Sequence, residues 1–539
     1  MAARGDGDRL THPVPTTSTA PRPLTPTGAT SVAATAPRVT AGLLGLLATA
    51  LAAIGSWSVS LWSDEAATIS AASRDPDELW RLLGNIDAVH GAYYAVMHVW
   101  VGLFGASPFS VRLPSAVAVG VAAAGVYLLA RRLDPRAAVW AAIIFALLPR
   151  VTWAGIEARP FALSIALAVW LTVMLHRAVT QGPRWLFAVY AVLLALATAV
   201  NLYVALIAAA HGVTLMLRPR LRRALPAFVA AALGGALLVA PLLRVALGQS
   251  GQLGGRDRGL LGVARNVAVN QWFLGETPTA TTASAATLQV DGSGMVWKVA
   301  AVGLALVCWV LIARALATAS AGRASSRADL LAWTVPWLVV PTVVVLLATL
   351  GSPTLYNARY FGFCAPAVAI LVAVGATSLP RRSAAAVSVV LVLLVVPVYQ
   401  SQRTLPAKSG ADWSRVAALL DGRTEVGDGV YFGPRDDPRD GTVLRSLRTV
   451  SIAYPEPFDG LADVTLLADP AEGATLFGTS GTLDAHVDRL EALDTLWVLR
   501  RQDRPDDAVA EDALLRDAGF TVVEEWDYPQ TEVLQLTRS

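Results

Sequence analysis

Long runs of apolar residues recur up to about residue 400, and they restrict the fold of this chain more than any other feature. The runs are continuous stretches of Ala, Leu and Val, and many approach the ~20 residues that a helix needs to cross a ~30 Å hydrocarbon core. They lack the alternation of apolar and polar residues that is typical of a transmembrane β-barrel. The chain is 55% hydrophobic and 15% charged, whereas soluble domains carry about 25% charged residues. We therefore expect an all-α polytopic membrane domain.

The apolar runs predict about eleven transmembrane helices. Arginines gather in alternate loops between them, for example Arg131 and Arg132, Arg222 and Arg223, and Arg381. This bias is typical of the cytoplasmic side, so the other loops and everything after the last span are expected outside the cell membrane. The predicted spans are 39–59, 109–130, 137–152, 161–177, 185–200, 202–217, 225–247, 295–317, 330–350, 360–379 and 383–400.

Composition divides the chain into three parts. Residues 1–38 are rich in Pro and Thr without an apolar run, and they predict a disordered cytoplasmic tail. The transmembrane domain, 39–400, is net basic, whereas 401–539 is net acidic. The acidic part alternates short helix-like and strand-like pieces, which predicts a small C-terminal α/β extracytoplasmic domain with a mostly parallel sheet. It has no nucleotide-binding motif, so we interpret it as a passive cap or an acceptor-binding module.

The first outer loop, 60–108, carries a pair of acids directly after the first span. Asp64 and Glu65 are costly to place near hydrocarbon, so they have either a function or a helix-capping role. Further along, a predicted amphipathic helix begins at His90 and Gly91, where free backbone N–H groups can meet an anion. Tyr93 belongs to the aromatic stripe of this helix, which either anchors it in the membrane interface or contacts a substrate.

Three more ionisable residues fall in outer loops: Glu157, Arg159 and Arg359. The guanidinium fork suits phosphate, although snorkelling to the interface, or for Arg159 a pair with Glu157, are alternatives. The two cysteines, Cys308 and Cys364, lie inside apolar segments, which argues against both a disulfide framework and a metal site. Without a compact cluster of His, Asp and Glu residues, we expect no metal and no other cofactor.

Several of these stretches together resemble the C-type glycosyltransferases, and more closely the branch of protein O-mannosyltransferases and lipid A aminoarabinose transferases. The resemblance covers roughly 40–380 and leaves out the tail and the C-terminal domain. It is carried by Trp62-Ser-Asp-Glu-Ala66, His90-Gly-Ala-Tyr-Tyr94, Arg112-Leu-Pro114, Glu157-Ala-Arg159 and Asn357-Ala-Arg359.

This resemblance implies an inverting membrane enzyme that moves a sugar, with mannose as first candidate, from a polyprenyl-phosphate donor. The acceptor would be a cell-envelope glycan, glycolipid or protein; membrane lipid is a partner and nucleic acid is not. Asp64 would be the general base and Glu65 would orient a hydroxyl or cap the helix. Arg359, Arg159 and His90 would face the lipid phosphate, with Glu157 as a second outer acid. The site should therefore bring Asp64 and Arg359 within reach of one phosphosugar.

Two other functions remain open from the sequence. A transporter or flippase for lipid-linked glycans would place ionisable residues near the membrane midplane and often shows internal repeats. Here the ionisable residues fall at one face, and the two halves of the chain show no similarity. A non-catalytic envelope scaffold is the third reading, and it holds if Asp64 does not face a substrate site.

Overall fold

The computed structural model describes residues 29–249, 259–275, 293–321, 325–351, 355–433, 447–502 and 505–539. The chain divides into two compact units, Met1–Thr40 and Ala41–Ser539. The first helix, α1 (Ala29–Ala53), begins ten residues before the predicted span, so the end of the predicted tail is helical. Residues 1–28 lie outside the described part, and disorder there stays a prediction.

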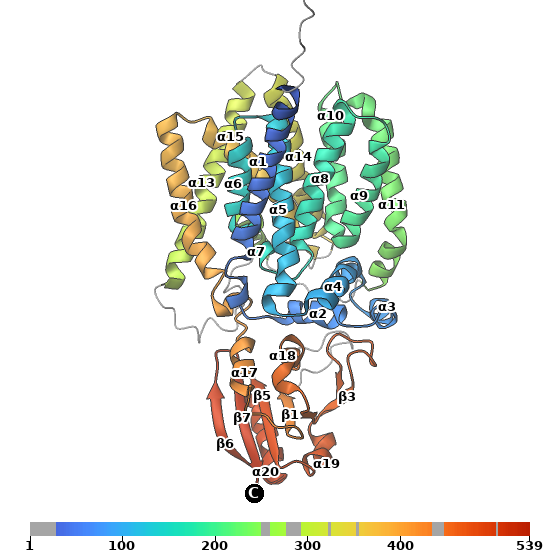
Figure 1. Ribbon diagram of the computed structural model, residues 1–539, viewed down its shortest axis with the longest axis vertical. Helices are drawn as coiled ribbons and strands as arrows, with labels where there is room; N and C mark the ends of the chain where they lie inside the picture. Colours follow the sequence, from blue (N-terminus) through green and yellow to red (C-terminus); the bar gives the residue numbers. More distant parts are fainter. Residues whose placement is uncertain are drawn as a thin grey trace, which may run out of the picture. The chain divides into compact units, whose positions relative to one another are not determined.

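Among the described residues, eight helices are long and apolar enough to cross a membrane. Figure 1 shows the long helices running side by side. They include α1, α5 (Pro108–Leu133), α8 (Phe161–Thr180), α11 (Leu225–Gly248), α13 (Ser293–Ala321), α14 (Ser325–Ala348), α16 (Arg381–Ser401), and α15 (Ala365–Thr377) with its leading 3-10 turn η8 (Ala358–Cys364). Each coincides with a predicted apolar run. The shorter α9 (Leu186–Val200) and α10 (Leu206–Leu217) coincide with two more, but their length leaves the count of eleven crossings a prediction.

One predicted span, 137–152, is broken in the structure. It forms α6 (Ala138–Leu147) and α7 (Pro149–Gly155), which are bent by 61° relative to each other. Pro149 explains the break, because proline cannot donate the helical hydrogen bond and its ring restricts the preceding residue. The break turns α7, with Arg150, away from the direction of α6.

Close helix contacts depend on small residues, as expected when lipid gives helices little hydrophobic reason to associate. A Cβ added at Gly120 of α5 would collide with Thr49 and with the backbone of Gly45 in α1. A Cβ at Gly375 of α15 would collide with the backbone of Leu311 in α13. The glycines thus bring these helices together.

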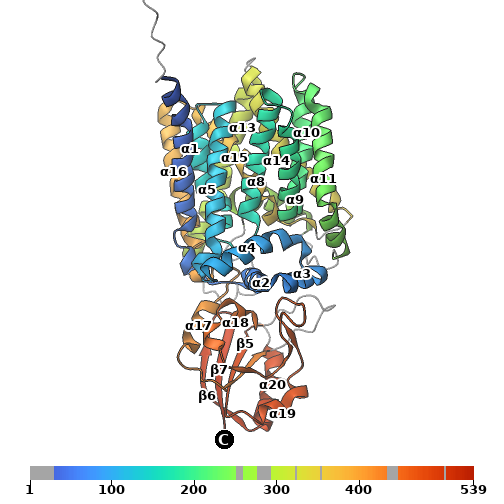
Figure 2. The ribbon, with the colours of Figure 1, turned by 45° about the vertical axis from the view of Figure 1, so that its right-hand side comes forward.

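Three short helices lie across one end of the long helices: α2 (Ser63–Ala72), α3 (Pro76–Asn85) and α4 (Gly91–Phe104), as Figure 2 shows. Asp75 and Glu78 form a capping box at the start of α3. Exposed apolar side chains of α4 suit a helix that lies in a membrane interface; they are Val96, Val99, Leu103 and Phe104. Helices α10 and α11, whose loop contains Arg222 and Arg223, join at the opposite end (Figure 1).

The C-terminal part is built on a five-stranded sheet with the order β2-β1-β5-β7-β6. Strand β1 is parallel to β2 and β5, whereas β7 is antiparallel to β5 and β6. The prediction of a mostly parallel sheet thus holds in part: β1, β2, β5 and β6 run in the same direction, whereas β7 runs against them. A short turn joins β6 to β7, and a short turn forces antiparallel pairing. The strands are β1 (Gly429–Gly433), β2 (Ala462–Asp463), β5 (Thr495–Arg501), β6 (Phe520–Asp527) and β7 (Thr531–Arg538), with a separate pair β3 (Leu466–Ala468) and β4 (Thr479–Ser480) and the helices α17 (Trp413–Leu420), α18 (Thr449–Ala453), α19 (Val487–Leu490) and α20 (Pro505–Asp517).

The C-terminal domain shares a hydrophobic core with the first outer loop. Buried residues of α2, α3 and α4 pack in one cluster with buried residues of α17, α18, β1, β5 and β7. The backbone N–H of Leu61 donates to Tyr454 Oη at 2.9 Å, and Ser70 Oγ donates to the carbonyl of Leu476 at 2.5 Å. The domain is therefore joined to the helix that carries Asp64.

Candidate active site

The two acids of the first outer loop begin α2 but meet different partners. Trp62 is extended and precedes the helix, so Asp64 and Glu65 fall in its first turn, where the helix dipole favours negative charge. Consecutive helical residues project ~100° apart, because a turn takes about 3.6 residues. One acid therefore faces outward to arginines from distant loops, while the other faces the protein interior.

Asp64 lies between two arginines. Its Oδ2 is 2.8 Å from Nη1 of Arg359 and 3.9 Å from Nε of Arg159, and its side chain remains 24% exposed. Arg159 Nη1 also donates to the backbone carbonyl of Asp64 at 3.3 Å. The structure thus brings together the acid and the two basic residues that the sequence predicts for one phosphosugar.

The charge state of Asp64 follows from these neighbours. Burial alone would raise the pKa of its carboxyl group, but Arg359 and then Arg159 outweigh burial, so the pKa lies below its usual value. Asp64 is therefore ionised at neutral pH and available to accept a proton.

Arg359 is held by its own local structure. It lies in η8, where Asn357 Oδ1 accepts from the backbone N–H of Arg359 at 3.2 Å. Arg150 Nη2 donates to the carbonyls of Ala358 at 2.7 Å and Arg359 at 2.6 Å, which fixes this turn from the side of α7. Sequence reasoning missed Arg150, although an arginine directly after a proline inside an apolar run is a signal for a functional or structural role.

His90 completes this group. Arg159 Nη2 lies 2.8 Å from His90 Nε2. Because a guanidinium only donates, Nε2 must accept, and a neutral imidazole then carries its proton on Nδ1. Burial, and after it Arg159, lowers the pKa of His90 well below its usual value, so the ring is neutral. Among the described residues, the buried Nδ1 has no hydrogen-bond partner and can donate to a substrate oxygen.

The two tyrosines of α4 support the site from inside the loop. Tyr94 Oη donates to Asp87 Oδ2 at 2.7 Å and accepts from Arg159 Nη1 at 3.3 Å. Tyr93 is 2% exposed, and burial raises the pKa of its hydroxyl. It belongs to the core of the loop, so anchoring in the membrane interface does not describe it, and its contact with a substrate stays a prediction.

Glu65 is enclosed rather than available to a substrate. Arg112 binds both carboxylate oxygens, with Nε to Oε1 at 2.8 Å and Nη2 to Oε2 at 2.5 Å, and neither side chain is exposed. The backbone N–H of Ala158 also donates to Oε1 at 3.0 Å. Both oxygens of Glu65 are bonded and its side chain is fully buried, so the structure gives no support to the hydroxyl-orienting role that the sequence allowed, and that role stays a prediction.

Glu157 does not pair with Arg159, the alternative that the sequence left open. Its Oε2 lies 3.5 Å from Nζ of Lys408, and the two side chains are 1% and 0% exposed. The Lys408 Nζ also lies 3.7 Å from the centre of the Trp153 ring. Lys408 follows the last span, outside the part of the chain on which the prediction of the site rested.

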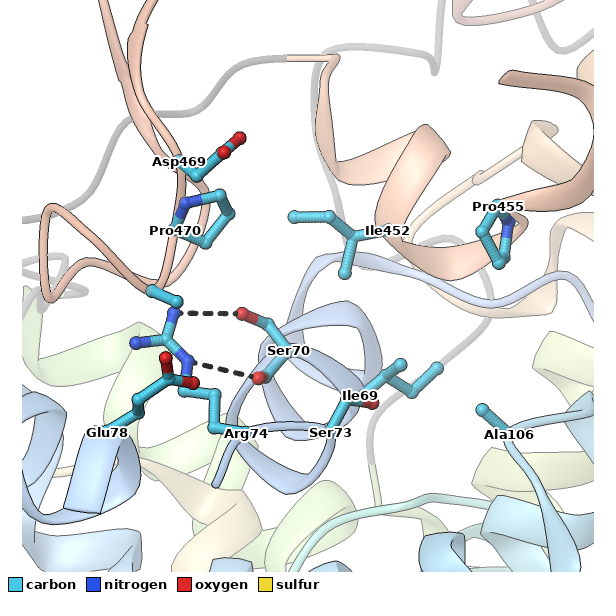
Figure 3. A pocket seen from close by; sticks show the side chains of 11 residues that line it. Ile69, Ser70, Ser73, Arg74, Glu78, Ala106, Ile452, Pro455, Asp469 and Pro470 are labelled. Atoms are coloured by element: carbon cyan, nitrogen blue, oxygen red, sulfur yellow. Dashed lines mark hydrogen bonds between the residues drawn. The ribbon is translucent and has the colours of Figure 1, made fainter. Parts of the chain in front are cut away.

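A cavity of about 380 Å³ opens between α2 and the C-terminal domain. Figure 3 shows Ser70 of α2, and Arg74 just after that helix, facing Ile452 and Pro470 across it. Its lining includes none of the residues Asp64, His90, Arg159 and Arg359. The cavity is therefore distinct from the arginine-lined site.

The described residues include one acidic group that could hold a metal ion, formed by Glu525, Asp527 and Glu532 on β6 and β7. Glu532 Oε2 already lies 2.7 Å from Arg500 Nε, and the other two are exposed. This group is part of the C-terminal sheet and does not include Asp64. Metal independence of the site stays a prediction.

Known proteins resemble this chain in sequence over one segment and in fold over most of its length. The family model described as dolichyl-phosphate-mannose-protein mannosyltransferase matches residues 92–244. No curated protein matches the chain in sequence. The fold is similar to that of ArnT from Cupriavidus metallidurans bound to undecaprenyl phosphate, with a TM-score of 0.54 and 14% identity, over 92% of this chain and 97% of that one. The apo state of the same protein gives 0.52 and 14%, over 93% and 98%. In sequence over residues 92–244 and in fold over most of its length, the chain resembles the C-type glycosyltransferases.

Proposed function

We propose that this protein is a multi-pass membrane glycosyltransferase that moves a sugar from a polyprenyl-phosphate donor to an acceptor hydroxyl. The observation that carries the proposal is the Asp64 carboxylate, ionised and partly exposed between Arg359 and Arg159 at one end of an apolar helix bundle. A lipid-linked donor would extend its tail along the helices while its phosphate meets the two guanidinium groups. The undecaprenyl phosphate named for the similar structure, and the mannosyl donor named for the matching family, support this choice of donor and of mannose as first sugar.

The reaction is a single displacement. Asp64 takes the proton of the acceptor hydroxyl, whose oxygen attacks the anomeric carbon as the bond between that carbon and the phosphate oxygen breaks. The electron pair of that bond leaves with the polyprenyl phosphate, and Arg359 and Arg159 stabilise the charge that develops there. Inversion at the anomeric carbon follows from one displacement. His90 Nδ1–H is placed to donate to a phosphate or sugar oxygen without adding charge.

The pairing of Asp64 with Arg359 also makes the strength of the base depend on the donor. The Arg359 guanidinium holds the pKa of Asp64 down and makes it a weak base. A donor phosphate would share that guanidinium and place a second negative charge beside Asp64, which raises the basicity of the carboxylate. Asp64 would thus become an effective base when the donor is bound.

The function is tested by incubating the purified protein with a panel of polyprenyl-phosphate sugars, with and without cell-envelope glycans, glycolipids and proteins. Transfer or slow hydrolysis of one donor, absent in Asp64→Asn, supports the proposal. The rival transporter would instead move a fluorescent lipid-linked glycan across proteoliposomes without breaking the sugar–phosphate bond. That result, with every donor left intact, would refute the transferase.

The proposed location of the site outside the cell membrane has its own test. Val426 is 89% exposed in the C-terminal domain, whereas the two native cysteines are buried. Val426→Cys should react with a membrane-impermeant thiol reagent in intact cells whose outer layers have been made permeable, and the parent protein should not. Labelling only after the membrane is broken would place the C-terminal domain in the cytoplasm.

A further inference from the structure

A linker, residues 402–412, leaves the last span and is attached to the loop that carries Arg159. Gln402 accepts from Thr152 Oγ1 at 2.8 Å and donates to the carbonyl of Pro149 at 3.0 Å. Six residues later, Lys408 reaches Glu157 at 3.5 Å and lies over the Trp153 ring. The linker is thus held along α7 and up to the beginning of the Glu157-Ala158-Arg159 segment.

The same linker is tied to the C-terminal sheet. The buried Asp412 accepts from the backbone N–H groups of Gln530 at 2.7 Å and Thr531 at 3.2 Å, and from Thr531 Oγ1 at 2.8 Å. Thr531 begins β7. A continuous set of contacts therefore runs from β7 through the linker to Glu157.

The three residues 157–159 are held from three directions. Glu157 meets Lys408, and its carbonyl accepts from Ser115 Oγ at 2.6 Å. The N–H of Ala158 donates to Glu65 Oε1, and its carbonyl accepts from Thr68 Oγ1 at 2.9 Å. Arg159 extends from this fixed backbone to Asp64 and His90. Of these hydrogen bonds and ion pairs, the one between Glu157 and Lys408 comes from beyond the last span.

Burial makes the ion pair between Lys408 and Glu157 costly to form. Both side chains are fully buried, and a buried ion pair is often replaced by uncharged residues of similar size at little cost in stability. Stability alone is therefore a weak reason for a lysine and a glutamate here, whereas a fixed position for the next two residues is a specific one.

We propose that Lys408 and Glu157 are positioning residues, through which the linker of the C-terminal domain sets Arg159 against Asp64 and His90. This rests on the proposed function, because it assigns Arg159 to the lipid phosphate. The C-terminal domain then contributes to the donor site, in contrast to the passive cap or acceptor-binding module that its sequence suggests. Neither residue touches the donor in this proposal; both act through Arg159.

The test combines binding and hydrogen exchange on the full-length protein. The double variant Lys408→Met/Glu157→Gln removes both charges together, so it avoids leaving one buried charge opposite an uncharged side chain. Binding of undecaprenyl phosphate is compared for the parent protein, the double variant, Arg159→Gln and the combination of all three. Arg403→Met, in the same linker but bonded to the carbonyls of Leu51 and Ile54, is the matched control.

We expect the double variant and Arg159→Gln each to weaken binding by on the order of tenfold, as the loss of one charge-assisted contact implies. Combining them should add little, because both changes act on the same contact. Arg403→Met should show no such coupling with Arg159→Gln. Independent, multiplying losses would overturn the proposal, and so would a double variant that binds like the parent protein.

Hydrogen exchange of the peptide around 155–162, measured without ligand, tests positioning even if the parent protein binds no undecaprenyl phosphate. A parent protein that binds no undecaprenyl phosphate would count against the proposed function and not against the positioning role of Lys408 and Glu157. Faster exchange in this peptide in the double variant, at an unchanged unfolding temperature, supports positioning. Unchanged exchange overturns it. Lys408→Arg keeps the charge and should restore part of the protection that Lys408→Met removes.

Discussion

Asp64 and Glu65 are neighbours of similar chemistry, and the structure puts them to opposite uses. Glu65 is sealed inside the protein, and Arg112 and a backbone N–H occupy its two oxygens. Asp64 is partly exposed, and so is its partner Arg359, so a ligand can reach this pair. Arg112, in contrast, is fully buried, and it also donates to the carbonyls of Ser56, Val59 and Ser60. An acid–arginine pair thus points to a reaction only when a ligand can reach it.

Of the variants considered, Asp64→Asn should cause the largest loss of sugar transfer. The amide keeps the shape of the side chain but cannot take a proton, so transfer should fall by ~10²–10⁴-fold. Turnover of purified protein, alongside its unfolding temperature, measures this. Asp77→Asn, an exposed acid in the first turn of α3, is the control and should be fully active. Retention of more than about half of the parent turnover by Asp64→Asn would show that Asp64 is not the base.

Glu65→Gln should produce the opposite kind of defect. Removing one partner of a buried pair leaves Arg112 charged inside the protein, which costs about 3–5 kcal/mol of stability. Thermal unfolding in detergent would detect the loss. Glu524→Gln breaks an exposed pair with Arg423 and should change stability by less than about 1 kcal/mol. If Glu65→Gln unfolded like the parent protein yet lost its activity, Glu65 would belong to the chemistry after all.

Arg359→Ala should affect the donor far more than the acceptor. Losing a charge-assisted contact to phosphate corresponds to roughly 10–100-fold in kcat/KM for the donor, with the acceptor KM nearly unchanged. Arg81→Ala, whose side chain is 56% exposed on α3, provides the comparison. A defect confined to acceptor titrations would assign Arg359 to the other substrate.

Arg159→Gln should shift the pH dependence. The pKa of Asp64 lies below its usual value because Arg359 and Arg159 overcome the effect of burial. With one guanidinium removed, that pKa rises, so protonation inactivates the base at a higher pH and the acid limb of kcat/KM moves upward. His90 is neutral in the parent protein and should contribute no limb near its usual value. An acid limb that stays in place, or moves to lower pH, would contradict this account of the carboxylate.

The sequence predicted the apolar helices well, since span length and composition are local properties. It also placed Asp64, Arg159 and Arg359 at one face, because arginine bias assigns loops to sides of the membrane. It could not assign partners within that face. Arg112 was read only as part of a motif, although it encloses Glu65. For Glu157 the sequence offered a place in the site or a pair with Arg159, and it gave no sign of Lys408.

The remaining errors have similar causes. The break at Pro149 lies inside an apolar run, so composition alone continues the helix across it. The direction of β6 and β7 depends on the turn between them, which a search for strands does not weigh. In both cases one proline or one turn determined the structure, and the composition of the surrounding segment did not show it.

The donor site is assembled from residues 64, 90, 159 and 359, and the contact through Lys408 comes later still. A ribosome makes this chain from its N-terminus, so Asp64 emerges long before the arginine that holds it. Contacts between such distant segments close late, after the helices between them have formed. Under the proposed function, a nascent or truncated chain that ends before Arg359 therefore carries the base without the complete phosphate site, and it should not consume lipid-linked sugar.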